Sequence, residues 1–339
     1  MDWSKKTVLL TGGTGSFGRT FTAVMLKKYN PKRLRIFSRD ELKQYNMRQA
    51  FGDDSRLSFL IGDIRDSTRL YRAVDGVDII VHAAALKQVP VCEYNPFEAV
   101  QTNVVGAENV INAAIDHNVE KVIAIGSDKA VNPVNLYGAT KMCMEKIFIA
   151  ANSYVGAARQ TRLSCVRCGN VIASRGSVVS LFLDLKRRGI KEFPITDKRM
   201  TRFWITLEQE VEFVVKCIDL MKGGEVFIPR VPSMKITDLA MAVDPSCRFK
   251  EVGIRPGEKI NETLVTEEEA RRTKEFKDFF IIEPDNPFWE LGRIEGGNPV
   301  AEGFRYTSNE NPEWLMKKDM ERLLKGAVSE SVPVNQGAL

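Results

Sequence analysis

The first turn of this chain constrains its fold more than any other stretch. An apolar run over residues 7–11 ends in Gly12-Gly-Thr-Gly15-Ser-Phe-Gly18, and a helical pattern covers residues 21–29. In a strand–turn–helix unit, such glycines allow a tight turn and a close approach of the backbone to a pyrophosphate, whose charge the helix N-terminus favours. The spacing is GxxGxxG, and the alternative is an ordinary glycine turn. Its position between strand and helix favours a dinucleotide site.

Strand and helix continue to alternate up to residue 125, which predicts the fold class. The patterns predict strands over residues 34–38, 57–61, 78–83 and 121–125. They predict helices over residues 41–51, after Asp66 up to Val74, and over residues 96–117. This order is typical of an α/β fold with a doubly wound parallel sheet of the Rossmann type. Such folds bind ligands beyond the carboxyl ends of their strands.

The pattern loosens after residue 170, where Gly, Pro and Arg become more frequent. We expect a dinucleotide-binding Rossmann domain over residues 1–170, to which later segments near 204–230 return. A smaller mixed α/β lobe over residues 171–330 would bind the substrate. Residues 331–339 are expected to be frayed.

Composition argues against several classes of function. The net charge is only +5, and the basic runs lack interleaved aromatic residues, so we expect no nucleic-acid partner. No stretch approaches the roughly 18 apolar residues of a membrane span. With no signal-peptide core either, we expect a cytoplasmic protein and no membrane contact. Cys165 and Cys168 form a CxxC in an expected strand, and the chain has only two histidines, so we expect core cysteines and no metal site.

The end of the second strand indicates which dinucleotide binds. An acidic residue there binds the ribose 2′-hydroxyl of NAD, whereas a nearby arginine accommodates the 2′-phosphate of NADP. Here Ser38 and Arg39 occupy the tip, and Lys43 lies one helical turn further on. We predict NADP rather than NAD. Asp40 complicates this reading unless it caps the following helix.

Three further positions lie along the same sheet edge. Asp63 follows the third strand, where the adenine would lie, and Ala83 begins an alanine run that lets a cofactor pass close to the fourth strand. Lys87 lies just beyond it. The alternative for Lys87 is a surface lysine, but its position favours a ligand role.

Tyr137 and Lys141 fall one helical turn apart, close to Ser127 at the end of the fifth strand. Tyrosine can act as a base near neutral pH only if its pKa falls by about 3 units, roughly 4 kcal/mol. The Lys141 ammonium and a positively charged nicotinamide supply a field of the right sign. The alternative is that Tyr137 and Lys141 have this spacing by chance. The glycine turn argues against chance, because it predicts a dinucleotide beside them.

Asp128 and Lys129 follow Ser127 directly and offer an acid and a base. Elimination of water from a sugar needs both, whereas a simple 4-epimerase needs neither. The alternative is a solvent-facing ion pair in a loop. Neighbouring side chains in a strand point apart, so both can enter a site only if the chain bends here.

Several longer segments carry a resemblance to a known family: residues 11–18, 38–43, 82–87, 132–141, 199–206 and 253–259. Together they resemble the inverting UDP-N-acetylglucosamine 4,6-dehydratases of the extended short-chain dehydrogenase/reductase family. Retaining hexose dehydratases typically have Asp-Glu where this chain has Asp128-Lys129. The resemblance implies NADP, UDP-N-acetylglucosamine as substrate and a homohexamer. It also implies a role at the start of pseudaminic acid biosynthesis, which feeds flagellin glycosylation.

The resemblance also implies roles for individual residues. Asp128, Lys129 and Tyr137 would be catalytic, with Ser127 sharing the substrate hydroxyl. The cofactor would contact Gly12, Thr14, Gly15, Ser16, Phe17, Gly18, Ser38, Arg39, Asp40, Lys43, Asp63, Ile64, Ala83, Lys87, Tyr137, Lys141, Val171 and Arg175. The UDP-sugar would contact Lys87, Asn170, Val178, Thr196, Arg255 and Glu258.

This chain departs from the family pattern at three positions. Ser127 stands where the family commonly has Thr, Cys168 where it has Tyr, and Ala173 where it has Gly. The first change keeps a hydroxyl. The other two leave the exact substrate preference open.

The expected reaction begins when Tyr137 takes the C4 hydroxyl proton and hydride passes to the nicotinamide. Lys129 then removes the C5 proton, Asp128 protonates the leaving C6 hydroxyl, and hydride returns to C6. A base must be neutral, so we expect the pKa of Lys129 to be lowered by burial and nearby cations. The alternatives are a UDP-sugar 4- or 5-epimerase and a non-catalytic NADP-binding regulator.

Overall fold

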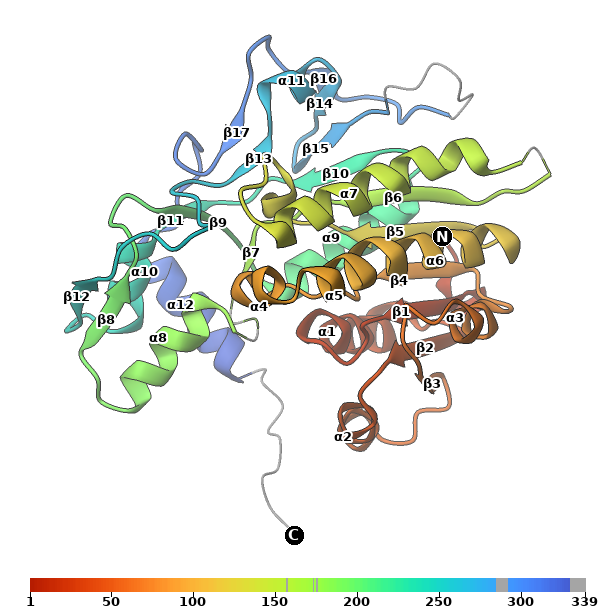
Figure 1. The fold of residues 1–339 in the computed structure, drawn as a ribbon, viewed down its shortest axis with the longest axis horizontal. Helices are drawn as coiled ribbons and strands as arrows, with labels where there is room; N and C mark the ends of the chain where they lie inside the picture. The colour runs from red at the N-terminus through yellow and green to blue at the C-terminus, as the bar shows by residue number, and fades with distance from the viewer. Residues whose placement is uncertain (157, 173, 175, 285–291, 330–339) are drawn as a thin grey trace.

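The structure, a computed structural model, describes residues 1–156, 158–172, 174, 176–284 and 292–329. Within these residues the main sheet has ten strands in the order β16-β14-β15-β10-β6-β5-β4-β1-β2-β3 (Figure 1). The parallel strands are β1 (Thr7–Thr11), β2 (Arg33–Ser38), β3 (Leu57–Ile61), β4 (Ile79–His82), β5 (Lys121–Ile125), β6 (Arg162–Val166) and β10 (Val226–Pro229). Antiparallel strands extend one edge: β15 (Phe279–Ile282), β14 (Thr273–Glu275) and β16 (Asn298–Pro299).

Helices cover both faces of this sheet, so the predicted doubly wound α/β fold is confirmed. One apolar core joins the sheet to α3 (Ser67–Val74), α6 (Gly106–Asp116) and α7 (Leu136–Ala150). A second core joins the other face to α1 (Ser16–Val24), α2 (Glu41–Phe51) and α9 (Leu207–Leu220). The central strands are buried on both sides, which explains their continuous apolar runs.

Two predicted helices differ in detail from those observed. The first begins at Ser16, earlier than expected, because Gly15 caps it in an extended conformation, and a π-helical turn, η2 (Met25–Tyr29), completes it. The helix predicted over residues 96–117 consists of α5 (Pro96–Val100), a π-helical turn η3 (Gln101–Val105) and α6. A short helix α4 (Val89–Tyr94) precedes it, and 3₁₀ turns η1 (Trp3–Lys5), η4 (Asp128–Ala130) and η5 (Ala151–Tyr154) complete this part.

A second group of elements gathers at one end of the sheet (Figure 1). Its helices are α8 (Val178–Arg187), α10 (Ile236–Val243) and α12 (Lys317–Ser329). Its strands are β7 (Asn170–Val171), β9 (Thr201–Ile205) and β11 (Ser233–Lys235) in one small sheet, and β8 (Glu192–Ile195) with β12 (Arg248–Glu251) in another. Phe182, Phe193 and Trp204 belong to its core.

The chain crosses between the two parts more than once. Both α9 and β10 lie on the main sheet, and β14 to β16 join it as well. The remaining elements are the pair β13 (Thr263–Val265) and β17 (Tyr306–Thr307), and the short helix α11 (Glu267–Ala270). The boundary at residue 170 stays a prediction, and the expected fraying of residues 331–339 lies outside the described residues. No helix in the described ranges is both long enough and apolar enough to cross a membrane.

Candidate active site

The glycine turn brings the backbone close to the carboxyl edge of the sheet. Gly12 has φ +67°, and a Cβ there would lie 2.8 Å from the backbone of Ala84, two residues after β4. The Gly15 amide donates to the Gly12 carbonyl (3.0 Å), and α1 starts at the next residue. A Cβ on Gly18 would overlap the carbonyl of Gly13, so this glycine lets α1 pack against the turn. Thr14 is buried within it. These features fit a dinucleotide pyrophosphate at the helix N-terminus.

The tip of β2 presents two exposed cations. The Lys43 amide donates to the Asp40 carboxylate (2.9 Å), which confirms that Asp40 caps α2. Lys43 also pairs with Asp40 through its ammonium (2.6 Å), and Arg39 lies 3.5 Å from Asp63. Such exposed pairs are weak and can rearrange around a ligand. Ser38 is buried and accepts a hydrogen bond from a glutamine of α2.

Asp63 and Lys87 occupy different surroundings along this edge. Burial would raise the pKa of the Asp63 carboxyl, but the Arg65 guanidinium outweighs this and lowers it. Next to it, Ile64 is buried against the core. Ala83 is half-buried at the end of β4, and Lys87 is exposed. Because Lys87 is exposed at the carboxyl edge of the sheet, it is accessible to a ligand.

The chain bends directly after β5, as a site containing both Asp128 and Lys129 requires. Ser127 is extended and caps the 3₁₀ turn η4, in which the next two side chains meet. The Lys129 ammonium donates to Asp128 Oδ1 (3.0 Å), and the Ser127 hydroxyl donates to the same oxygen (2.9 Å). A Cβ at Gly138 would overlap the Lys129 carbonyl, so this glycine lets α7 pack against the turn.

Tyr137 and Lys141 lie on the first turns of α7, whose N-terminus Asn135 caps. The Lys141 ammonium donates to the carbonyl of Ile125 at the end of β5. Burial lowers the pKa of Lys141 to about 8. Burial also raises the pKa of Tyr137 to about 12, although Lys129 and the Ser127 hydroxyl act in the opposite direction. The protein alone therefore does not supply the lowered tyrosine pKa that we expected.

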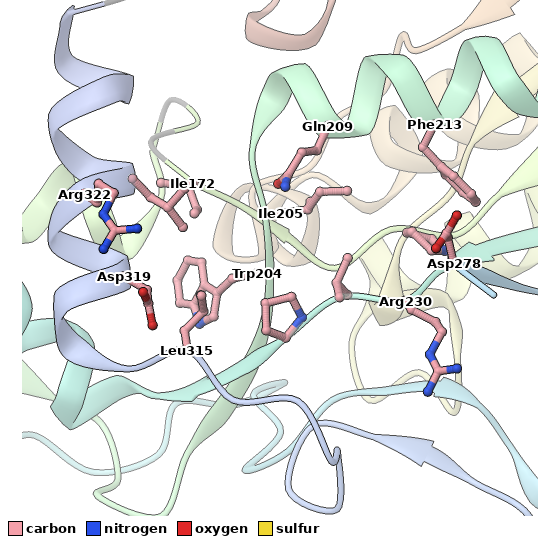
Figure 2. Close-up of a pocket in the computed structure, with 14 residues that line it drawn as sticks. Ile172, Trp204, Ile205, Gln209, Phe213, Arg230, Asp278, Leu315, Asp319 and Arg322 are labelled. Atoms are coloured by element: carbon pink, nitrogen blue, oxygen red, sulfur yellow. The ribbon is translucent and has the colours of Figure 1, made fainter.

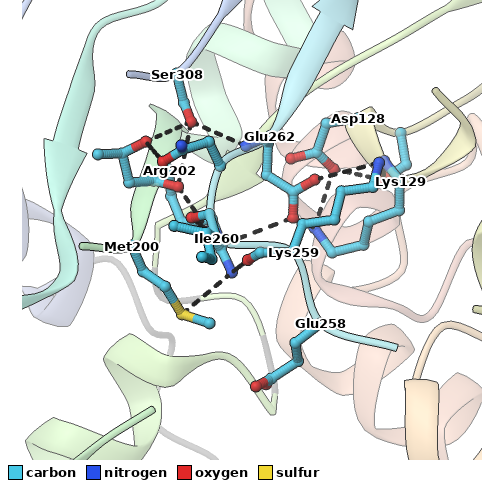
Figure 3. Close-up of polar contacts among 12 residues, drawn as sticks. Asp128, Lys129, Met200, Arg202, Glu258, Lys259, Ile260, Glu262 and Ser308 are labelled. Atoms are coloured by element: carbon cyan, nitrogen blue, oxygen red, sulfur yellow. Dashed lines mark hydrogen bonds and ion pairs between the residues drawn. The ribbon is translucent and has the colours of Figure 1, made fainter. Parts of the chain in front are cut away.

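Lys129 lies in a cluster of buried charges that the sequence did not predict (Figure 3). Its ammonium is 3.5 Å from the Glu262 carboxylate, which also faces Arg202 (3.7 Å) and Lys259 (3.9 Å). Burial lowers the pKa of Lys129, but Asp128 and Glu262 outweigh it and raise the pKa above its ordinary value. The expectation of a lowered pKa was wrong, because it counted neighbouring cations and missed Glu262.

Apart from Lys87, which follows β4 on the main sheet, the residues predicted to bind substrate fall in two places. The turn with Arg255 and Glu258, which pair at 3.1 Å, packs against the start of α7 through a hydrogen bond from Asn135 to the Gly257 carbonyl (2.7 Å). This turn lies near Tyr137. The others lie along the second group of elements: Asn170 in β7, Val178 at the start of α8 and Thr196 after β8.

Asn170 has a buried side-chain oxygen without a hydrogen-bond partner among the described residues, which suits a ligand contact. Val171 follows it in β7. No hydrogen bond in the described part of the chain joins Val178 or Thr196 to Tyr137. Arg175 and Ala173 lie outside the described residues.

Sequence reasoning also missed a buried glutamate on α9. Glu210 lies beside Cys168, and both side chains are buried. Cys165 is buried as well, so both cysteines of the CxxC lie in the core, as we expected. Burial raises the pKa of Glu210 to about 7, while the Cys168 thiol and Lys87 lower it in part. The only signal in the sequence was a charge on the apolar face of a helix.

A cavity of about 490 Å³ lies elsewhere, between β9, α9 and α12 (Figure 2). Trp204, Gln209 and Arg322 are among its lining residues, and none of the predicted catalytic residues lines it. The predicted catalytic residues lie instead at the carboxyl edge of the sheet.

Comparison with known proteins agrees with this geometry. A family described as "Polysaccharide biosynthesis protein" matches residues 8–284. A Campylobacter jejuni protein named UDP-N-acetylglucosamine 4,6-dehydratase (inverting) is 48% identical over 329 residues, which are 95% of this chain and 98% of that protein. A Rickettsia massiliae protein named UDP-glucose 4-epimerase is 41% identical over 328 residues, covering 94% and 95%.

Among solved structures, Pen from Bacillus thuringiensis aligns with a TM-score of 0.86 and 36% identity, covering 96% of this chain and 100% of that one. The similarity in both fold and sequence therefore covers nearly the whole chain. The chain belongs to the polysaccharide biosynthesis protein family, within the extended short-chain dehydrogenases/reductases, as its resemblance to inverting UDP-N-acetylglucosamine 4,6-dehydratases predicted.

Proposed function

We propose that this protein is an NADP-dependent UDP-N-acetylglucosamine 4,6-dehydratase that inverts C5. Its product would be UDP-2-acetamido-2,6-dideoxy-β-L-arabino-hex-4-ulose, which makes it a carbon–oxygen lyase. The observation that carries the proposal is the contact of 3.0 Å between Asp128 and Lys129 beside Ser127. Oxidation of a sugar hydroxyl needs only Ser127, Tyr137 and Lys141, whereas elimination also needs an acid and a base.

Each residue has a defined task in this reaction. Tyr137 takes the proton of the C4 hydroxyl, and Ser127 holds that hydroxyl. The nicotinamide, when bound, supplies the acceptor for the C4 hydride that is later returned to C6. The C4 ketone makes C5–H acidic, so that Lys129 can remove this proton while Asp128 protonates the departing C6 oxygen. A proton from solvent adds to C5 on the opposite face and gives the inverted sugar, and Tyr137 releases the proton of the C4 hydroxyl to solvent.

The ion pair explains how Lys129 can act as a base although its pKa is raised. One proton moves from the Lys129 ammonium to Asp128 along their hydrogen bond and leaves a neutral amine and a carboxylic acid. The amine then takes the C5 proton, and the acid gives its proton to the C6 oxygen as the C–O bond breaks. Water leaves, and the original ion pair is restored. No external acid or base is needed for this step.

Support for NADP comes from the tip of β2. Asp40 is engaged as a helix cap, while the Arg39 and Lys43 cations are exposed where a 2′-phosphate would bind. Further parts of the proposal rest on the resemblance or on composition: a homohexamer, a cytoplasmic setting without nucleic-acid partners, and a role in pseudaminic acid biosynthesis for flagellin glycosylation.

A UDP-sugar 4-epimerase is the second candidate, because the 41% identical relative carries that name. NMR of UDP-N-acetylglucosamine incubated with the purified protein separates the two. A C6 methyl doublet together with an inverted C5 is the expected result. Formation of UDP-N-acetylgalactosamine alone would support the epimerase, and unchanged substrate would refute both.

A further inference from the structure

Glu262 is a second carboxylate at Lys129, and nothing in the proposed reaction uses it. Its side chain is only 3% exposed. One carboxylate oxygen lies 3.5 Å from the Lys129 ammonium and 3.7 Å from the Arg202 guanidinium, and the other lies 3.9 Å from the Lys259 ammonium. These distances are longer than hydrogen bonds. Glu262 therefore acts on Lys129 through its charge.

The backbone of Glu262 is fixed from both sides by Ser308 (Figure 3). The Glu262 amide donates to the Ser308 hydroxyl (2.9 Å), and the Ser308 amide donates to the Glu262 carbonyl (2.8 Å). Thr201 of β9 contacts the same hydroxyl at 2.6 Å. The carboxylate thus projects from a rigid position.

The other two cations of the cluster are already engaged with backbone carbonyls. Arg202 donates to the carbonyls of Thr201 (2.7 Å), Lys259 (2.9 Å) and Ile260 (2.9 Å). The Lys259 ammonium donates to the carbonyl of Val131. In the described part of the chain, the Lys129 ammonium has its hydrogen bond to Asp128 and its charge contact with Glu262.

Glu262 also leaves one carboxylate oxygen without a hydrogen bond among the described residues. Burying a carboxylate that is held by charge alone is costly. If Glu262 had only a structural role, a residue whose polar groups all found hydrogen-bond partners could replace it with little loss of stability. The cost is explained if the charge serves the chemistry at Lys129.

We propose that Glu262 is the positioning residue of the elimination step: its fixed carboxylate holds the Lys129 ammonium beside Asp128, so that the pair starts each turnover charged. The inference rests on the proposed dehydratase function. The proton that Lys129 gives up passes to Asp128 and returns with the C5 proton, so both residues end as they began. Glu262 neither gains nor loses a proton.

The test is Glu262→Gln, which keeps the shape and removes the charge. We expect kcat for dehydration to fall between about tenfold and a hundredfold because Lys129 is misplaced, with KM changed less than about twofold. Without the negative charge the Lys129 ammonium loses its proton more easily, so the alkaline limb of the kcat profile, where the pair loses the proton that it shares, should move about one unit to lower pH. The charged or titratable groups that also face this site are Asp128, Arg202, Lys259, Tyr137 and Lys87.

Single turnovers locate the affected step. Reduced nicotinamide should accumulate in Glu262→Gln, because oxidation at C4 precedes the elimination. Glu262→Asp keeps the charge and should restore the alkaline limb of the wild type. Glu225→Gln is the matched control: Glu225 is equally buried, but it is bound by Ser164 and backbone amides far from the site, and its replacement should leave the pH profile unchanged.

Two outcomes would overturn the inference. The first is a wild-type kcat and pH profile in Glu262→Gln, and the second is equal losses of kcat in Glu262→Gln and Glu262→Asp with an unmoved alkaline limb. The second pattern would mean a purely structural role. A wild-type protein that forms no 4-keto-6-deoxy sugar would refute the proposed function itself. An active wild type with an unaffected Glu262→Gln would refute the role of Glu262 alone.

Discussion

Two buried charge clusters in this protein are built in opposite ways. In the first, Arg167 after β6 lies between Glu145 of α7 and Glu269 of α11. Each of its five N–H groups has an acceptor, with Glu269 at 2.9 and 3.0 Å and the Leu264 carbonyl at 2.7 Å. In the second, Lys129 and Glu262 lie 3.5 Å apart, and both Asp128 and Glu262 keep an oxygen without a hydrogen bond in the described structure.

If the proposed function holds, this difference separates a structural cluster from a reactive one. A saturated network has one arrangement, and removing a partner leaves an uncompensated buried charge. An unsaturated cluster with long contacts leaves room for a proton to move and for substrate atoms to enter. Geometry, more than burial or charge count, therefore distinguishes the two.

The strongest test of the comparison removes the reactive cation. Lys129→Met should lower the dehydration rate about 10⁴-fold, equivalent to about 5.5 kcal/mol, because it deletes the base and the proton source of Asp128 together. Its unfolding free energy should fall by less than that of an Arg167 variant, because Arg202 and Lys259 still face Glu262. Lys5→Met, which removes an exposed pair with Asp2, is the control. Retention of full dehydration by Lys129→Met would refute the assignment of the base.

The structural cluster should respond in the reverse manner. Arg167→Leu leaves Glu145 and Glu269 buried without their cation and should lower the unfolding free energy by about 3–5 kcal/mol. Folded protein below the transition temperature should still dehydrate its substrate. Urea unfolding monitored by circular dichroism measures the loss. A variant with normal stability and no activity would reverse the two roles.

Glu210 sharpens the comparison because it is a buried acid with neither kind of network. Its folded pKa of about 7 lies above the ordinary value of 4.5, so the folded state holds the proton more tightly than the unfolded chain. The resulting stability is complete below pH 4.5 and is lost as the pH rises to about 7. Glu210→Gln does not titrate and should be up to about 3 kcal/mol more stable than the wild type at pH 8.

Thermal unfolding from pH 5 to 8 measures this difference. The wild type should lose stability over that range, whereas Glu210→Gln should lose less. Cys168 and Lys87 face the same carboxyl, so Cys168→Ser is a useful second variant. Parallel pH profiles for the wild type and Glu210→Gln would exclude Glu210 as the titrating group.

Local signals explain what the sequence could predict. Apolar runs between polar turns located the parallel strands of the main sheet, and the spacing of Tyr137 and Lys141 placed both at the start of one helix. The cap formed by Asp40 and the bend after Ser127 also follow from neighbouring residues. Each of these features depends on a few consecutive side chains.

Long-range contacts explain what it could not predict. Glu262 reaches Lys129 only because the segment before β13 packs over the turn after β5, and no pattern near either residue records that approach. The pKa of Lys129 was assigned the wrong direction for the same reason. The strands β14 and β16 were missed because they are short and lack the continuous apolar runs of the parallel strands, whereas the apolar run of β15 was overlooked.

The exposed ion pairs at the tip of β2 complete the comparison and carry the smallest expected effect. The Arg39 side chain is 52% exposed and its contact with Asp63 is long, so the pair contributes little to stability. If Arg39 binds the 2′-phosphate, Arg39→Ala should weaken NADP binding by about 1–2 kcal/mol and leave NAD binding nearly unchanged. Titration calorimetry with both dinucleotides measures this, with Arg33→Ala, an exposed arginine at the start of β2, as the control. Equal losses for both dinucleotides would mean that Arg39 supports the site without selecting the phosphate, and a wild type that prefers NAD would overturn the assignment of NADP.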